Sequence, residues 1–215
     1  MTTSKIIQPN FAVRLSLLVV LLCFNWGQPT FGEDEPRPPA IGDKAPAWVD
    51  LPGTDDKVHS LESLRSKDVV VVCFTCNSCP YASDYEDRLI SLQTKFVKEG
   101  LSAQLVAINA NTVPADRMDK MKERAAQKKF NFPYLWDESQ TVAKAYDAIY
   151  TPEFYVLNKD RVIIYRGALD DATVADKVQV KYVELAVAAG LMGVRPEIEK
   201  AGARGCGIRF NRTRR

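Results

Sequence analysis

The fold is decided by residues 69–81, VVVVCFTCNSCPY, in which a run of strand formers ends in two cysteines. Four consecutive valines without polar alternation are typical of a strand buried on both faces, as in a parallel sheet covered by helices. From Tyr81 onward, apolar residues recur every three or four positions with charged residues between them, which predicts an amphipathic helix. Cys76 and Cys79 therefore lie where a buried strand gives way to a helix N-terminus.

This position favours thiol chemistry. A thiolate is the reactive form of cysteine, and the partial positive charge and unpaired N–H groups of a helix N-terminus stabilise it. We expect Cys76 to be the attacking thiolate. Cys79, one turn further on, would resolve the mixed disulfide by forming the Cys76–Cys79 bond. Pro80 suits the first helical turn, because its missing N–H would be unpaired there in any case.

Two other interpretations of the cysteine pair are weaker. Half of a structural zinc site would need a second pair of ligands, and the chain has a single histidine, His59, well upstream. An inert structural disulfide would restrain the unfolded chain little, because its loop is so short. A lone histidine without a visible partner is more often structural than catalytic. Because the sequence shows no second set of metal ligands, we expect neither a metal nor another cofactor.

The ends of the chain differ from its middle in composition. Residues 1–32 are predicted to be a signal peptide, because an apolar run of about ten residues follows two basic ones and is short for a membrane span. An uncleaved anchor is the alternative, and would be the reason for any membrane contact. Residues 33–40 form a charged, proline-rich linker. We expect one domain over residues 41–195 and a C-terminal tail over residues 196–215.

The charge balance does not predict a nucleic-acid partner. The chain has 29 Lys and Arg against 27 Asp and Glu. Its terminal basic run has no interleaved stacking aromatics beyond Phe210, so a solvated tail is expected there.

Within that tail, Cys206 lies between two glycines. It is either a resolving or disulfide-forming cysteine or a free thiol, and spacing does not separate these possibilities. Cys73 fits a small buried hydrophobe.

Strands and helices alternate along the domain. We expect a strand over residues 101–109, a charged helix over residues 114–130 and a strand over residues 150–157. Pro152 near the head of that last strand would lose a ladder donor, and an X-Pro bond is the kind that readily adopts the cis form. The alternation predicts an α/β fold with right-handed crossovers.

Several motifs together resemble the thioredoxin-like superfamily and, within it, the alkyl hydroperoxide reductase/thiol-specific antioxidant (redoxin) group. The matching pieces occur in the right order and are Phe74-Thr75-Cys76-Asn77-Ser78-Cys79-Pro80-Tyr81, Phe132-Pro133-Tyr134-Leu135-Trp136-Asp137-Glu138-Ser139, Thr151-Pro152-Glu153-Phe154 and Tyr165-Arg166-Gly167-Ala168-Leu169-Asp170-Asp171. The resemblance implies a thioredoxin-like fold, with a central mixed β-sheet flanked by helices. It also implies that Pro152 is a cis-proline packed against the cysteines, and that Thr151 and Pro152 position a thiol substrate.

The function implied is that of a secreted or periplasmic thiol-disulfide oxidoreductase, an antioxidant redoxin whose redox-active centre is the Cys76–Cys79 dithiol or disulfide. Its partners would be protein or small-molecule thiols and disulfides. The resemblance departs from many thioredoxins at residues 69–72, which hold no carboxylate to accept the proton of the second cysteine. The expected substitute is either Glu153, beside the cis-proline, or water.

Two alternatives stay open. Peroxiredoxins resemble this fold but use a Pro-x-x-x-Thr/Ser-x-x-Cys motif, and here Cys76 occupies the Thr/Ser place. A thiol peroxidase acting on peroxides would therefore use Cys79 as the sulfur attacked, with Arg166 as an anion partner and Cys206 as a further accessory residue. A metal-handling thioredoxin-like protein would instead pair the thiolates with a downstream histidine, and none follows His59.

Overall fold

The computed structural model describes residues 37–211. The predicted signal peptide and the first part of the linker lie outside the described residues. The strands and α-helices, in chain order, are β1 (Leu51–Pro52), β2 (Val58–His59), β3 (Val69–Phe74), α1 (Pro80–Lys98), β4 (Ala103–Asn109), α2 (Met118–Lys128), β5 (Tyr134–Trp136), α3 (Thr141–Ala145), β6 (Tyr150–Thr151), β7 (Glu153–Leu157), β8 (Ile163–Gly167), α4 (Tyr182–Leu191) and β9 (Cys206–Gly207).

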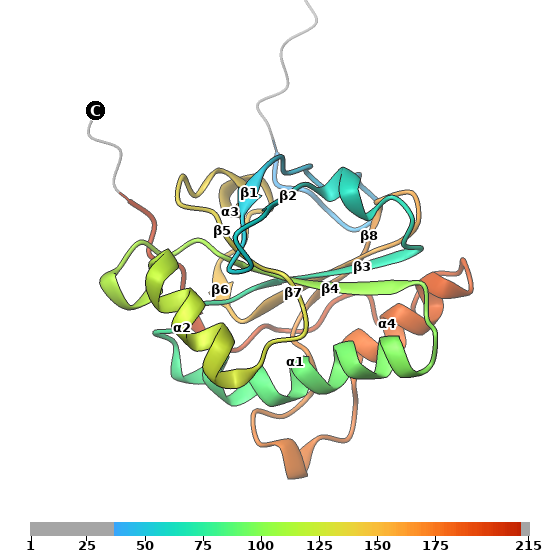
Figure 1. Ribbon diagram of the computed structural model, residues 1–215. Helices are drawn as coiled ribbons and strands as arrows, with labels where there is room; N and C mark the ends of the chain where they lie inside the picture. The colour runs from blue at the N-terminus through green and yellow to red at the C-terminus, as the bar shows by residue number, and fades with distance from the viewer. Residues whose placement is uncertain (1–36, 212–215) are drawn as a thin grey trace, which may run out of the picture. The chain divides into compact units, whose positions relative to one another are not determined.

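A mixed five-stranded sheet forms the centre of the described domain, in the order β5-β4-β3-β7-β8 (Figure 1). β3, β4 and β5 run parallel to one another, whereas β7 pairs antiparallel with both β3 and β8. The valine run is the middle strand of this sheet and is buried along its whole length. This arrangement confirms the α/β class and the central mixed sheet predicted from the sequence.

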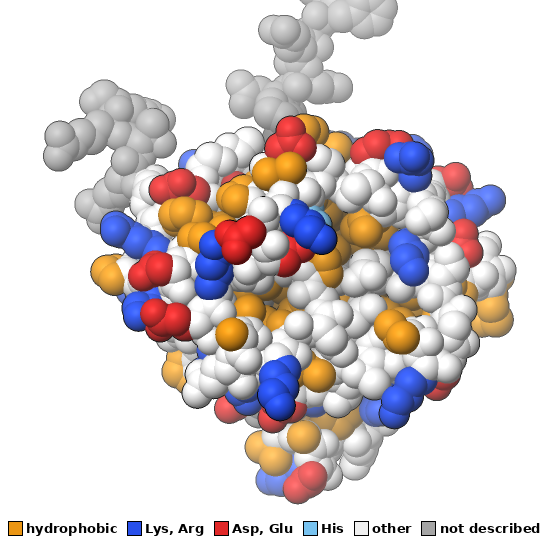
Figure 2. Space-filling model, viewed as in Figure 1, with side chains coloured by type: hydrophobic (Ala, Val, Ile, Leu, Met, Phe, Trp, Pro, Cys, Tyr) orange, Lys and Arg blue, Asp and Glu red, His pale blue; other side chains and the backbone are white. Residues whose placement is uncertain are grey.

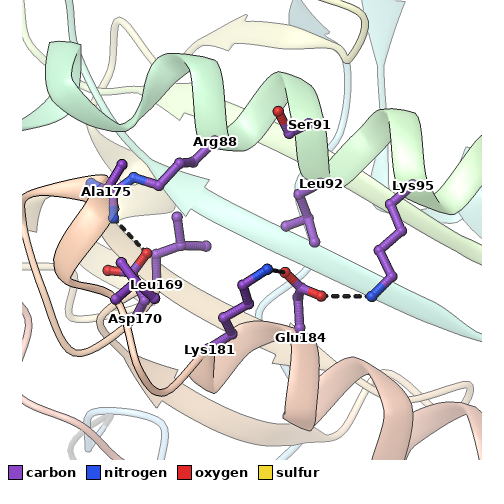
Figure 3. A pocket seen from close by; sticks show the side chains of 10 residues that line it. Arg88, Ser91, Leu92, Lys95, Leu169, Asp170, Ala175, Lys181 and Glu184 are labelled. Carbon is purple, nitrogen blue, oxygen red and sulfur yellow. Dashed lines mark hydrogen bonds and ion pairs between the residues drawn. The ribbon is translucent and has the colours of Figure 1, made fainter.

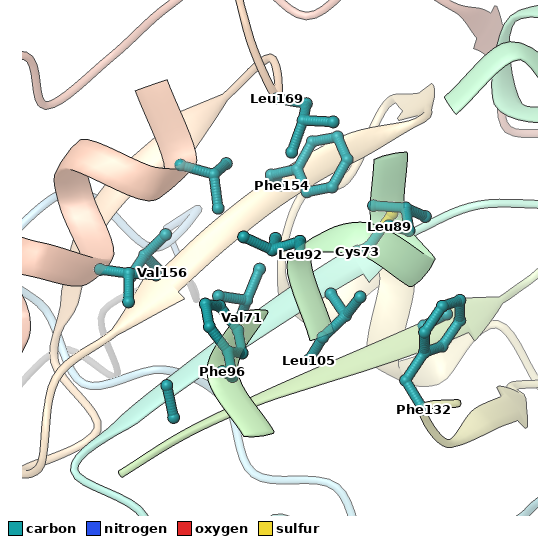
Figure 4. Close-up of a cluster of buried hydrophobic side chains, with 14 of the residues drawn as sticks. Val71, Cys73, Leu89, Leu92, Phe96, Leu105, Phe132, Phe154, Val156 and Leu169 are labelled. Atoms are coloured by element: carbon teal, nitrogen blue, oxygen red, sulfur yellow. The ribbon is translucent and has the colours of Figure 1, made fainter. Parts of the chain in front are cut away.

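Both faces of β3 are covered, which explains why its sequence does not alternate. Val69, Val71 and Cys73 pack beneath α1 and α4 in one apolar cluster, part of which Figure 4 shows. Val70 and Phe74 point to the opposite face, into a second cluster that includes side chains of α3 and of the N-terminal segment. Successive side chains of a strand point to opposite faces, so a strand between two apolar layers needs apolar residues throughout.

Two predicted elements are interrupted in the structure. The charged helix expected over residues 114–130 is a short 3-10 turn, Pro114–Asp116, followed by α2, because Arg117 between them has an extended backbone with φ −77° and ψ 162°. The strand expected over residues 150–157 is divided into β6 and β7 by Pro152, which lacks the N–H that a ladder requires.

The C-terminal tail also differs from its prediction. Residues 199–201 exchange backbone hydrogen bonds with Arg166 at the edge of the sheet, and β9 pairs antiparallel with β6. The described part of the tail, up to residue 211, is therefore paired with the domain through its backbone, while the side chains of Arg204 and Arg209 are exposed to solvent as expected. On the face seen in Figure 2, basic and acidic side chains lie interspersed. None of the helices in residues 37–211 is long and apolar enough to cross a membrane.

Candidate active site

The two cysteines lie where the sequence predicts. Cys76 follows β3, and Cys79 is the N-cap residue of α1, with Pro80 as the first helical residue. The Cys79 sulfur accepts a hydrogen bond from the backbone N–H of Ala82 at 3.4 Å. One of the unpaired donors at the helix N-terminus is thus used by a sulfur atom, an interaction that favours the thiolate. Both residues are buried, with exposed fractions of 3% for Cys76 and 1% for Cys79.

The turn between the cysteines is held by a residue that sequence reasoning missed. Asp116 is fully buried, and its carboxylate accepts hydrogen bonds from the backbone N–H of Ser78 at 2.8 Å and from the Ser78 hydroxyl at 2.6 Å. The neighbouring Asn77 side chain donates to the Ala115 carbonyl at 3.0 Å and accepts from the Tyr134 hydroxyl at 3.1 Å. The 3-10 turn that carries Asp116 therefore fixes the conformation of the turn between the cysteines.

The loop at Pro152 faces the sulfurs, as the resemblance implied. The Thr151–Pro152 peptide bond is cis. The Cys79 thiol lies 2.9 Å from the Thr151 carbonyl oxygen, to which it donates, and the Cys76 sulfur lies 3.5 Å from the Thr151 hydroxyl oxygen. Thr151 is buried and so contacts both cysteines from the opposite side of the site. That Thr151 and Pro152 position a substrate stays a prediction.

Glu153 and Arg166 pair with each other. The Arg166 guanidinium donates to Glu153 Oε1 at 2.8 Å, while Glu153 Oε2 accepts the backbone N–H groups of Ile149 at 2.8 Å and Tyr150 at 3.2 Å. Arg166 also forms an ion pair with Asp147. Both carboxylate oxygens of Glu153 are occupied, so its expected role as proton acceptor for a cysteine does not fit the structure. The anion-partner role expected of Arg166 does not fit either, since carboxylates surround its charge.

The two thiols influence each other's protonation. Hydrogen bonds from the Cys76 thiol, the Cys206 thiol and the Ala82 N–H lower the pKa of Cys79, against the opposing effect of burial. The hydrogen bond to Cys79, burial and the nearby Asp116 carboxylate raise the pKa of Cys76. The Thr151 carbonyl favours a protonated Cys79, but it is one acceptor against three donors. The directions of these two shifts favour a thiolate on Cys79, whereas the sequence leads us to expect it on Cys76, and which cysteine carries it stays a prediction.

Cys206 joins this group from the C-terminal tail. It packs against the small apolar cluster formed by Cys76, Cys79 and Ala82, and all three site cysteines are free thiols in the structure. Cys73 is a free thiol too, but it is buried inside β3, and burial raises its pKa. The described chain therefore brings three of its four cysteines to one place.

His59 and a cavity between α1 and α4 are separate from this centre. His59 pairs with Asp55 at 3.0 Å, beside the hairpin of β1 and β2. A cavity of about 340 Å³ lies between α1 and α4 (Figure 3), and no cysteine lines it. Its charged groups are paired, Arg88 with Asp170 at 2.5 Å and Lys95 with Glu184 at 2.6 Å. Among residues 37–211, no group of three or more His, Cys, Asp or Glu side chains is arranged to hold a metal ion.

Known proteins give the family context of this site. The sequence profile of the AhpC/TSA family matches residues 41–166, more than half of the chain. The chain belongs to the AhpC/TSA family. This membership confirms the predicted redoxin relationship and the predicted oxidoreductase class. A search of curated protein sequences gives no significant match for this redoxin.

Solved structures resemble the redoxin over most of its length. An uncharacterized conserved protein from Geobacillus kaustophilus shares 34% identity, covering 81% of this chain and 94% of its own, with a TM-score of 0.75. A hypothetical protein, SMc02350 from Sinorhizobium meliloti 1021, shares 28% identity, with coverages of 81% and 97% and a TM-score of 0.74. Peroxidoxin BcpB from Mycobacterium tuberculosis is 21% identical, covers 73% of this chain and 99% of its own, and has a TM-score of 0.55, a likeness in fold alone. The thioredoxin-like fold expected from the sequence is confirmed.

Proposed function

We propose that this redoxin is an extracytoplasmic thiol-disulfide oxidoreductase that exchanges its Cys76–Cys79 dithiol or disulfide with protein or small-molecule thiol partners. The observation that carries the proposal is the contact of both sulfurs with Thr151, at 3.5 Å for Cys76 and 2.9 Å for Cys79, at the N-terminus of α1. The signal peptide expected over residues 1–32 supports an extracytoplasmic location, where disulfides persist.

The protonation of the two cysteines supports different roles for them, with Cys76 as the nucleophile and Cys79 as the base. The thiolate form of Cys79, which no longer donates to the Thr151 carbonyl, is a base that lies against Cys76, and the pKa of Cys79 is lowered while that of Cys76 is raised. As Cys76 attacks a substrate disulfide, its proton moves to Cys79, one substrate sulfur becomes bound to Cys76, and the other leaves as a thiolate. The Cys76 sulfur becomes the nucleophile only during this step, so a raised pKa in the resting state does not prevent it from attacking.

Resolution of the mixed disulfide transfers the proton from Cys79 to the substrate. Cys79 gives its proton to the departed thiolate, and its sulfur then attacks Cys76, forming the Cys76–Cys79 disulfide and releasing the second substrate sulfur as a thiolate that takes a proton from water. Two electrons pass from the pair to the substrate, and two substrate thiols are produced. The same steps in reverse oxidise a substrate dithiol. The departed thiolate thus accepts the proton of the second cysteine, the role for which residues 69–72 hold no carboxylate.

A side-by-side assay of protein-disulfide reduction and hydrogen peroxide consumption tests this proposal, with the wild type, Cys76→Ser and Cys79→Ser. We expect reduction to be lost in both variants, a mixed disulfide to accumulate in Cys79→Ser, and peroxide turnover to be low throughout. Peroxide turnover that survives Cys76→Ser but disappears in Cys79→Ser, with little disulfide reduction by the wild type, would contradict the proposal.

One observation favours a second candidate, a thiol peroxidase. The lowered pKa of Cys79 and its hydrogen bond from the Ala82 N–H are features of a sulfur that attacks peroxide. In that reaction the Cys79 thiolate and a proton convert a hydroperoxide to an alcohol, or to water, and leave a Cys79 sulfenic acid. A neighbouring thiol then forms a disulfide with Cys79 and releases water. The pairing of Arg166 with Glu153 removes the anion partner expected for this route.

A further inference from the structure

The C-terminal strand lies on the loop that faces the active-site cysteines. β9 pairs antiparallel with β6, and Cys206 is the direct partner of Thr151 in this ladder. The Ile208 N–H donates to the Ile149 carbonyl at 2.8 Å, and the Thr151 hydroxyl lies 3.4 Å from the Cys206 carbonyl. Thr151 therefore contacts all three cysteines of the site, two through their sulfurs and one through the paired backbone.

The approach of this strand is built into the sequence. Gly205 lies so close to the Pro152 loop that an added Cβ would be 2.1 Å from the Thr151 carbonyl oxygen, a distance that no side chain could adopt. Glycine is thus required where the tail reaches the active site. Without a side chain at residue 205, the backbone of the tail can bring Cys206 against the cysteine pair.

Residues beyond Cys206 anchor the strand to the domain. Ile208 is buried in the apolar cluster on one face of the sheet. The Gln140 side chain donates to the Arg209 carbonyl at 2.9 Å and accepts the Asn211 N–H at 2.7 Å, and the Arg209 N–H donates to the Asn111 side chain at 2.9 Å. These bonds hold the tail on both sides of its backbone, so the position of Cys206 is fixed by the fold.

The Cys206 side chain lies against the active-site cysteines. It packs against the cluster of Cys76, Cys79 and Ala82, and its interaction with Cys79 raises the pKa of Cys206. Cys206 is half-buried, whereas the other two are buried more deeply, so it is the sulfur of the group with the greatest access to solvent. A thiol in contact with one sulfur of a disulfide is placed to exchange with it.

We infer that Cys206 is a third redox-active cysteine, which takes over the active-site disulfide by forming a Cys79–Cys206 bond within the chain. This inference rests on the proposed function, because it requires that a Cys76–Cys79 disulfide forms. The Cys206 thiol loses its proton and attacks the Cys79 sulfur, the Cys79–Cys206 bond forms, the Cys76–Cys79 bond breaks, and Cys76 leaves as a thiolate that takes up the proton. One disulfide replaces another, so no external oxidant or reductant is needed.

The exchange changes which cysteine of the site is a free thiol. After it, Cys76 is a free thiol beside Thr151, while the chain as a whole retains one disulfide. The tail is then covalently joined to the N-terminus of α1 and covers the β6 edge. The disulfide then no longer includes Cys76, and the reverse step restores the Cys76–Cys79 disulfide.

Peptide mapping of the full chain tests the inference. The wild type, Cys76→Ser, Cys79→Ser and Cys206→Ser are oxidised with diamide, free thiols are blocked in acid, and disulfide-linked peptides are identified by mass spectrometry after digestion. Trypsin releases residues 205–209, and chymotrypsin separates Cys73 from residues 75–81 by cutting after Phe74 and Tyr81. Cys23 falls in a different peptide. Cys76→Ser and Cys79→Ser each leave one cysteine in residues 75–81, so the link to Cys206 is unambiguous in these two variants.

We expect a Cys79–Cys206 link in Cys76→Ser, at a level at least tenfold above any Cys76–Cys206 link in Cys79→Ser. The Cys206→Ser control should form the Cys76–Cys79 disulfide as the wild type does. If the wild type forms that disulfide but Cys206 carries the blocking reagent in every protein, Cys206 has formed no disulfide. The inference is then wrong and the proposed function stands. If no Cys76–Cys79 disulfide forms in Cys206→Ser, where Cys206 cannot take it over, the proposed function and the inference fail together.

Discussion

The buried carboxylate of Asp116 accepts two hydrogen bonds from Ser78, one from the backbone N–H at 2.8 Å and one from the hydroxyl at 2.6 Å. A carboxylate from a distant turn thus sets the conformation of the residues between the two cysteines. Its negative charge also acts on the chemistry, since it is one of the groups that raise the pKa of Cys76. Asp116 is therefore a positioning residue of the site and one source of its electrostatics.

Asp116→Asn should weaken the turn and make Cys76 more acidic. The amide retains one acceptor for Ser78 but loses the charge, so we expect the free energy of unfolding to fall by about 1–2 kcal/mol. Removal of the charge should lower the pKa of Cys76, and its alkylation rate at neutral pH should rise more than twofold. Site-resolved mass spectrometry of iodoacetamide-treated protein measures that rate. Asp119→Asn is the matched control, because Asp119 is exposed on α2; an equal rise in both variants would contradict the role of Asp116.

The protonation of the cysteine pair predicts how the stability of the reduced protein depends on pH. The pKa of Cys79 is lowered in the folded state. At pH values between this folded-state pKa and about 8.5, the pKa of an unfolded thiol, Cys79 is deprotonated in the folded protein and protonated in the unfolded one. Unfolding then takes up a proton, so the free energy of unfolding rises with pH. The pKa of Cys76 is raised, so above about 8.5 the folded state retains a proton that the unfolded state loses, and stability falls with further increase in pH.

Urea unfolding at a series of pH values should therefore show a maximum in the cysteine contribution near pH 8.5, about the pKa of an unfolded thiol. Thiolate absorbance in the ultraviolet should show one thiolate persisting well below that pH in the reduced wild type, and this signal should vanish in Cys79→Ser. If the low-pH thiolate instead persists in Cys79→Ser and vanishes in Cys76→Ser, the assignment of the thiolate to Cys79 is wrong.

Glu153→Gln should destabilise the protein without changing the pH dependence of disulfide exchange. The glutamine NH₂ would replace the oxygen that accepts the Ile149 and Tyr150 N–H groups, and the charge of Arg166 would lose its buried partner. We expect a loss of about 2–4 kcal/mol in urea unfolding. In the ion pair of Lys120 and Glu123 both side chains are largely accessible, so the control Glu123→Gln should cost less than about 0.5 kcal/mol. A changed pH profile of exchange in Glu153→Gln would restore Glu153 as a proton acceptor.

Gly205→Ala should detach the C-terminal strand from the active site. Its Cβ would meet the Thr151 carbonyl oxygen at 2.1 Å, so either the tail or the Pro152 loop must move. We expect the free energy of unfolding to fall by about 1–3 kcal/mol and the yield of the Cys79–Cys206 link in a Cys76→Ser background to fall at least fivefold. Gly202→Ala is the control within the same tail, since a Cβ there meets nothing within 4 Å. Equal yields from both alanine variants would show that the tail does not need this close approach.

The sequence by itself determined the elements whose signals are local. The unbroken apolar run of β3, the periodicity of α1 and the proline after Thr151 are patterns of neighbouring residues, because burial on two faces, helical packing and a missing N–H each leave a trace at fixed short spacing. These patterns located Cys76 and Cys79, the family resemblance added Thr151, and the structure brings the three into contact.

Tertiary structure alone decided the rest of the site. Asp116 contacts Ser78 across 38 positions of the chain, and Cys206 meets Thr151 across 55, and neither contact has a spacing that periodicity could reveal. The basic composition of the tail favoured a solvated segment, but backbone pairing with β6 and the burial of Ile208 outweigh it. The protonation of the cysteines was decided in the same way, since it depends on which donors and charges the fold assembles around each sulfur.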